Sequence, residues 1–135
     1  MSVQMMNSTI QRFNTIHWHD SKLAGLCFYR AEGEERVKIS LEMLGDGGAL
    51  TPAEMIFKES TYVALDVDLE GKRVCSDDIS SAECYASSEW TKSLSEKSPY
   101  DSFEGYLHFQ LYLIPPGGTI NVLAKDFLLE MGTPR

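Results

Sequence analysis

The chain has 135 residues, of which 43% are apolar and 24% charged, values typical of one globular domain. No apolar run approaches the roughly 20 residues that a membrane helix needs, and twelve basic against twenty acidic side chains leave a net charge of −8. Since no lysine and arginine cluster could neutralise phosphates, the sequence argues against membrane and nucleic-acid partners.

The N-terminal segment and the cysteines favour a cytoplasmic protein. The opening MSVQMMNSTIQRF has neither a lysine-rich start nor an apolar stretch of signal-peptide length. Cys27, Cys75 and Cys84 are an odd number without C-x-x-C spacing, which suits reduced thiols better than a disulfide framework. Free cysteine often behaves as a small buried apolar residue, so we expect all three to be structural or incidental.

The first predicted element is a β-hairpin. The segment LAGLCFYRA, residues 23–31, is apolar on both faces, so we expect it to lie deep in the fold. The EGEE sequence at 32–35 supplies a glycine-containing turn. After it, RVKISLEML alternates apolar and polar residues with the period of a half-buried strand, its apolar row being Val37, Ile39, Leu41 and Met43.

The next segments predict a connector and a further strand. LGDGGALTP at 44–52 lacks the lysine and serine or threonine of a phosphate-binding loop and indicates a flexible connection. TYVALDVDLE then repeats the alternation, with one apolar row formed by Val63, Leu65, Val67 and Leu69. The opposite face of this strand carries Asp66, Asp68 and Glu70.

The last part of the chain predicts one helix and a second hairpin. Ala86, Trp90 and Leu94 recur at helical spacing behind possible caps at Ser87 or Ser88, which indicates a short helix near 87–97 whose Trp90 packs on a sheet. FEGYLHFQLYLI and TINVLAKDFLLEM flank PPGG at 115–118, where two prolines end one strand and two glycines permit a tight reversal.

Together these elements predict a mainly β protein. We expect an antiparallel β-sandwich or open barrel of about six strands, with one short helix across an opening or a face. Neither a repeat nor a linker is evident, so residues 1–135 should form a single β-rich domain.

The stretch HWHDS at 17–21 is the first candidate site. In an extended backbone His17 and His19 face the same side, and alternating histidines on a strand can reach one metal ion. A third ligand would have to come from elsewhere, with His108 or the pair Asp66 and Asp68 as candidates. However, Asp20 and Ser21 are residues that readily close turns, so a structural turn is the favoured interpretation.

Recognised catalytic signatures are missing from the sequence. There is no G-x-S-x-G, no H-E-x-x-H, no dinucleotide or P-loop fingerprint, and no cysteine next to a histidine in a known signature. Asp66 and Asp68 could in principle act as acid and base, but two acids spaced by two on a solvated strand are usually just that face. We therefore expect no cofactor and no catalytic residues.

Three segments carry a resemblance to a known group of proteins. HDSKLAGLCF, YVALDVDL and LHFQLYLIPPGGTINVLAKDFLLE resemble a broad group of small bacterial proteins of uncharacterised function, some similar to immunity proteins of polymorphic-toxin systems. His19, Asp20 and Ser21 match the strand entry of that group, and Asp126 with Phe127 matches its closing hairpin. The resemblance implies a cytoplasmic β-rich protein that binds another protein and has no established catalytic residues.

Two functional hypotheses follow. The first is a non-enzymatic, immunity-like binding protein whose acidic face, with Asp66, Asp68 and Glu70 and the acids at 32–35, meets a basic protein partner. The second is a small metal-binding protein or metal-dependent enzyme that uses His17, His19 and His108. The sequence leaves the oligomeric state open.

Overall fold

The computed structural model describes residues 3–45, 48–67, 78–98, 103–114 and 117–133. Its helices are α1, Val3–Asn14, and α2, Glu89–Lys97. Its strands are β1, Ser21–Ala31; β2, Glu34–Leu44; β3, Leu50–Lys58; β4, Tyr62–Val67; β5, Asp78–Tyr85; β6, Leu107–Leu113; β7, Gly118–Ala124; and β8, Asp126–Met131. Neither of these helices is long and apolar enough to span a bilayer.

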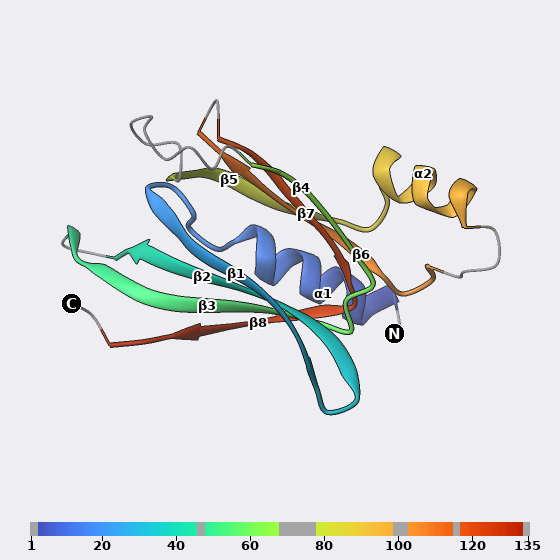
Figure 1. Cartoon of the computed structure of the whole chain (residues 1–135), viewed down its shortest axis with the longest axis horizontal. Helices are drawn as coiled ribbons and strands as arrows, with labels where there is room; N and C mark the ends of the chain where they lie inside the picture. The colour runs from blue at the N-terminus through green and yellow to red at the C-terminus, as the bar shows by residue number, and fades with distance from the viewer. Residues whose placement is uncertain (1–2, 46–47, 68–77, 99–102, 115–116, 134–135) are drawn as a thin grey trace.

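All eight strands belong to one antiparallel open sheet in the order β4-β7-β6-β5-β1-β2-β3-β8. The expectation of a mainly antiparallel β protein is therefore confirmed, whereas about six strands and one helix were too few. The sheet consists of a first group, β1, β2, β3 and β8, and a second group, β5, β6, β7 and β4 (Figure 1). They are joined where Ser21 and Lys22 of β1 pair with Ile79 and Asp78 of β5.

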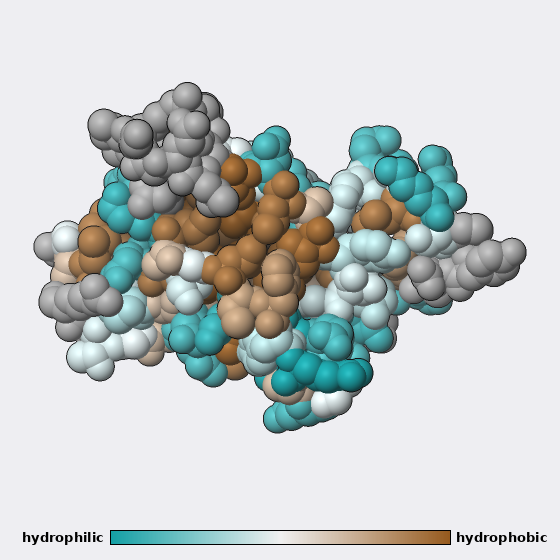
Figure 2. Space-filling view, viewed as in Figure 1, coloured by the Kyte–Doolittle hydropathy of each residue, from teal (hydrophilic) through white to brown (hydrophobic). Residues whose placement is uncertain are grey.

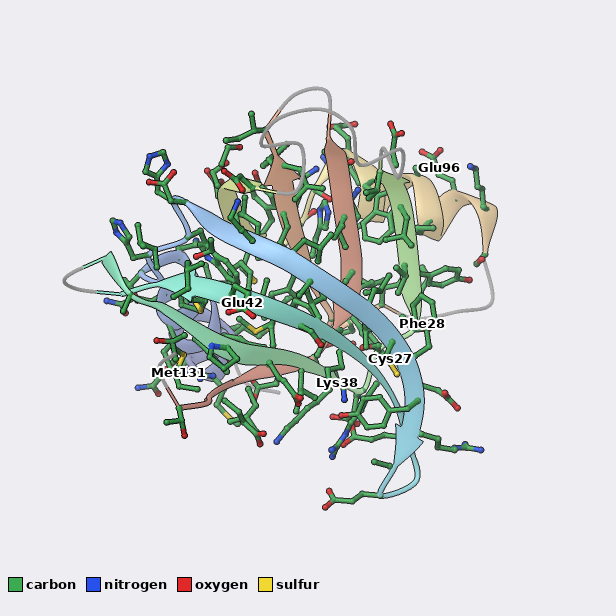
Figure 3. The ribbon with its side chains drawn as sticks, turned by 60° about the vertical axis from the view of Figure 1, so that its left-hand side comes forward. Cys27, Phe28, Lys38, Glu42, Glu96 and Met131 are labelled. Atoms are coloured by element: carbon green, nitrogen blue, oxygen red, sulfur yellow. The ribbon has the colours of Figure 1, made fainter. Side chains whose placement is uncertain are left out.

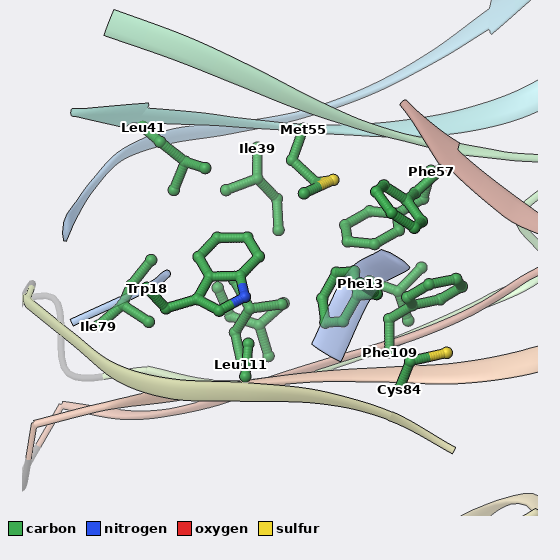
Figure 4. Packing of buried hydrophobic residues seen from close by; sticks show 14 of the residues in the cluster. Phe13, Trp18, Ile39, Leu41, Met55, Phe57, Ile79, Cys84, Phe109 and Leu111 are labelled. Atoms are coloured by element: carbon green, nitrogen blue, oxygen red, sulfur yellow. The ribbon is translucent and has the colours of Figure 1, made fainter. Parts of the chain in front are cut away.

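Helix α1 lies between the two groups and supplies the centre of the core (Figure 1). Phe13 is fully buried, and its ring lies 5.0 Å from that of Phe109 in the second group and 5.2 Å from that of Phe127 in the first. Trp18 closes the same cluster at 5.4 Å from Phe13 (Figure 4). Because aromatic rings bury large apolar areas, this helix holds the two groups of strands together.

Polar contacts fix α1 against both groups. Arg12 bonds Asp126 at the start of β8 with a nitrogen–oxygen distance of 3.0 Å. The amide of Asn14 donates to the carbonyl oxygen of Cys84 at 3.3 Å and its oxygen accepts from the N–H of Cys84 at 2.7 Å. The Asn14 side chain thus pairs with both backbone hydrogen-bonding groups of Cys84 at the edge of β5, as a neighbouring strand would.

Several local predictions are confirmed. The turn at 32–33 joins β1 to β2, and β6 pairs with β7 as a hairpin, although Pro115 and Pro116 lie outside the described residues. Helix α2 falls within the predicted range, with Ser88 as its N-cap. Its Trp90 ring packs 4.6 Å from the ring of His108 on β6, so the helix does lie on the sheet.

Other local predictions were wrong. Residues 50–52 belong to β3 and not to the connector, and the strand Asp78–Tyr85 has no counterpart among the predicted elements. The predicted last strand is divided at Lys125 into β7 and β8. Strand β1 does not lie deep, since Cys27 and Phe28 are exposed. Residues 68–70 of the strand predicted from TYVALDVDLE lie outside the described part of the chain.

Candidate functional site

His17 and His19 lie in the connection between α1 and β1. Both are exposed, while Trp18 between them is buried. The N–H of Ser21 donates to the carbonyl oxygen of Trp18 at 2.9 Å, and Asp20 adopts a positive φ of 65°. The segment is therefore a turn, and the Asp20 carboxylate lies 3.5 Å from Nε2 of His19.

His108 has a different environment on the outer face of the second group, beneath α2. Its Nε2 lies 2.8 Å from Oδ1 of Asn121 on β7, and its Nδ1 lies 2.8 Å from Oγ of Ser88. The residue is only 3% exposed. Burial lowers the pKa of the ring, with the bond to Asn121 acting in the opposite direction.

The three histidines do not share a site. Ser21, next to the histidine pair, is opposite Ile79 at the start of β5, whereas His108 is opposite Tyr85 at its end. Six residues of strand separate these positions by about 20 Å. Among the described residues no group of three or more histidine, cysteine or acidic side chains could hold a metal ion.

The candidate acids are also dispersed. Asp66 is exposed on β4, and Asp68 lies outside the described residues. At the 32–35 turn the guanidinium of Arg36 binds Glu32 at 3.0 Å and Glu34 at 2.7 Å, which neutralises much of that charge. The N–H of Ser60 donates to the carbonyl oxygen of Glu35, so the turn lies near the start of β4, several residues from Asp66.

The two described cysteines are free thiols. Burial, reinforced by the charge of Asp126, raises the pKa of Cys84 to about 12, so this residue stays an uncharged part of the core, as predicted for it. Cys27 is exposed on β1, and Cys75 lies outside the described residues.

Two shallow hollows lie on the outer faces of the strands. One, of about 390 Å³, is lined on the first group by Glu42, Glu54 and Glu130, among others. Glu54 on β3 is directly opposite Glu130 on β8, so two like charges face each other across the strand pair. The Nζ atom of Lys38 lies 3.9 Å from Oε2 of Glu54. The other, of about 480 Å³, lies beside α2 and is lined by residues such as Thr91, Lys92 and Tyr106.

The most distinctive surface is an open seam between β1 and β4. On β1, Leu23, Leu26 and Phe28 are opposite Leu41, Ile39 and Val37 of β2, which are buried, so these side chains share the inward face. On β4, Val63 and Leu65 are likewise opposite the buried Val122 and Ile120 of β7. We call Leu23, Leu26, Phe28, Val63, Leu65 and Val67 the apolar seam.

The seam residues point toward the core but remain partly uncovered. Leu23, Leu26, Val63 and Val67 pack against the core, yet Phe28 is 60% exposed and Leu65 47% exposed. Figure 2 shows apolar side chains gathered in the middle of this face, where β1 and β4 lie in Figure 1. Figure 3 shows β1 crossing in front of the second group, with Phe28 projecting from it.

The sequence predicted the alternation of β4 but took β1 to be apolar on both faces, and it did not show that the apolar rows of the two strands border one opening. Large exposed apolar patches on soluble proteins commonly mark sites that bind other molecules, whereas single exposed apolar residues are normal. Comparisons with protein-family models, with curated proteins and with solved structures found no match for this chain.

Proposed function

We propose that this chain is a non-enzymatic, cytoplasmic protein-binding module whose partner is a basic protein. The observation that carries the proposal is the apolar seam of an acidic chain, with Phe28 60% and Leu65 47% exposed at a net charge of −8. A partner that covers these side chains would remove their apolar surface from water, and this burial would stabilise the complex.

Charge adds selectivity to this surface. A net charge of −8 attracts a basic protein over distances longer than the contact itself and speeds encounter. Asp66 is exposed on the same strand as Leu65, on its opposite face, and Glu42, Glu54 and Glu130 line a hollow on the outer face of the first group, so these acids act on a partner at longer range. The resemblance of residues 19–21 to the strand entry of immunity-like proteins makes a basic toxin domain one fitting partner.

The first test uses the protein as bait in a lysate of cells that naturally make it. The seam variant Phe28→Ser/Leu65→Ser is compared with the matched control Val3→Ser/Leu128→Ser, which removes two exposed apolar side chains on α1 and β8. We expect one basic protein to be retained by the wild type and the control and lost from the seam variant. Retention by the seam variant, or recovery of an acidic partner, would contradict the proposal.

The second test measures association kinetics with that partner at two salt concentrations. Exposed charges are screened over about 8 Å at physiological ionic strength, so association should slow as salt is added. Asp66→Asn/Asp68→Asn should lower the on-rate more than it raises the off-rate. Glu89→Gln/Glu96→Gln on α2 makes the same charge change elsewhere and should have a smaller effect.

A further inference from the structure

Strand edges border the apolar seam on both sides. Strand β4 pairs only with β7, so its other edge has no neighbouring strand among the described residues. Strand β1 pairs with β5 only at Ser21 and Lys22, which leaves its edge open beyond them. Along such an edge the backbone N–H and C=O groups of alternate residues point away from the sheet and can pair with another extended chain.

Of the two edges, β4 is the more regular template. It pairs with β7 at each of its residues from Tyr62 to Val67 without a register shift. Strand β1, by contrast, has an irregularity between Leu23 and Gly25. The sequence YVALDV contains no proline, glycine or lysine, which are among the residues that commonly prevent edge strands from pairing.

We propose that β4 binds an extended segment of the partner as an added strand, and that this segment alternates apolar and basic residues. The proposal rests on the proposed function and specifies how the partner is recognised. Apolar side chains of the segment would lie on the seam beside Leu65 and Phe28. Its basic side chains would lie on the opposite face beside Asp66, which is exposed and forms no ion pair with any described residue.

Charge complementarity favours a basic partner over a second copy of this chain. Two copies would each carry a net charge of −8, and each pairing strand would carry Asp66. Like charges across a strand pair are destabilising, whereas an opposite-charge pair adds a small favourable contribution. The same repulsion by Asp66 disfavours an acidic segment, so we expect the bound segment to alternate apolar and basic residues.

The test uses a labelled peptide in which valine and lysine alternate over seven residues, with binding followed by fluorescence anisotropy. A block-ordered peptide of identical composition and an alternating valine–glutamate peptide serve as controls. We expect the first peptide alone to bind. Leu65→Ser should weaken its binding about tenfold or more, because an apolar contact is lost, and Asp66→Asn up to about fivefold.

Matched variants on the other end strand report on specificity. Leu128→Ser and Glu130→Gln on β8 make the same chemical changes on an exposed leucine and an exposed acid, and binding should not change. Equal weakening by these variants would overturn the assignment to β4. Dimerisation of the free protein that Leu65→Ser abolishes would also overturn it, because the occupant would then be a second copy.

A backbone-methylated peptide separates this inference from the proposed function. Methylation at alternate amides on the pairing edge removes the ladder hydrogen bonds and should abolish binding, and the intact peptide should slow hydrogen exchange at residues 62–67. Equal binding of the methylated peptide, or no binding of the intact one, overturns strand addition. The lysate experiment with Phe28→Ser/Leu65→Ser then decides independently whether the seam binds a protein.

Discussion

The hydroxyl of Ser88 lies 2.8 Å from Nδ1 of His108, so the N-cap residue of α2 is hydrogen-bonded directly to a buried histidine ring on β6. The amide oxygen of Asn121 can only accept, so Nε2 of His108 carries the proton it donates there at 2.8 Å. In the neutral ring, Nδ1 is then free to accept the hydroxyl proton of Ser88. Burial favours this neutral form because it lowers the pKa of the ring.

We therefore predict that the stability of the protein falls as His108 becomes protonated. Burial lowers its pKa below 6.5 in the folded state, whereas the unfolded chain titrates near 6.5. The unfolded state then binds more protons, so stability is complete above 6.5 and decreases as the pH falls from 6.5 toward the lowered pKa. Urea unfolding between about pH 7.5 and pH 5.5 measures this decrease.

Two variants assign this pH dependence to one histidine. In His108→Gln the decrease should be smaller than in the wild type, whatever the overall stability of the variant. In His17→Asn/His19→Asn it should persist, because both of those side chains are exposed. A decrease of the same size in His108→Gln would show that other groups cause it.

Ser88 itself should contribute to stability as a cap. Its Oγ accepts from the N–H of Thr91 at 3.2 Å, and its N–H donates to the hydroxyl of Thr91 at 2.8 Å. Ser88→Ala should cost about 0.5–2 kcal/mol, the usual range for a lost N-cap. The neighbouring exposed Ser87→Ala is the control and should change the free energy of unfolding by less than about 0.5 kcal/mol.

The sequence predicted the strands whose alternation is uninterrupted. Strands β2 and β4 show a clean period of two because β2 buries one face in the core and the apolar row of β4 points toward the same core. Strand β5 was missed because its inward residues, Ile79, Ala82 and Cys84, are not evenly spaced, and the register shifts between Ile79 and Ser81. Such an irregularity removes the period that sequence reasoning depends on.

The division between β7 and β8 has a signal that was overlooked. Ile120, Val122 and Ala124 are buried at even positions, but the next inward residue is Phe127, three positions after Ala124. A strand makes that change of parity only at a bulge or a break, and here the chain breaks. At the break, the N–H of Lys125 donates to the carbonyl oxygen of Lys58 at 3.1 Å, and the chain passes from the second group to the first.

Helix α1 and the candidate site were harder to predict. Met6, Ile10 and Phe13 do recur at helical spacing and pack on the core, but few other residues of α1 are apolar, so the stripe is narrow. The apolar seam depends on strand order: β1 and β4 are far apart in the sheet but border the same core. Alternation within one strand cannot show which edges remain uncovered.

Phe13 should be the most sensitive residue of α1. Its ring contacts Trp18, Phe57, Phe109 and Phe127 from both groups of strands. Phe13→Ala should destabilise the protein by about 3–5 kcal/mol, because a large cavity would form where the groups meet. Val3→Ala on the same helix, 73% exposed, is the control and should stay within about 0.5 kcal/mol in denaturant unfolding.

Two variants at Asp20 distinguish whether its backbone conformation or its carboxylate matters for the stability of this turn. Asp20 has a φ of 65°, a conformation that costs most residues about 1 kcal/mol or more but is permitted for glycine. Asp20→Ala should therefore destabilise the protein by about 1 kcal/mol, whereas Asp20→Gly should remain within about 0.5 kcal/mol of the wild type in thermal or urea unfolding. If both variants lose the same stability, the Asp20 carboxylate and not the backbone conformation accounts for the residue at this turn.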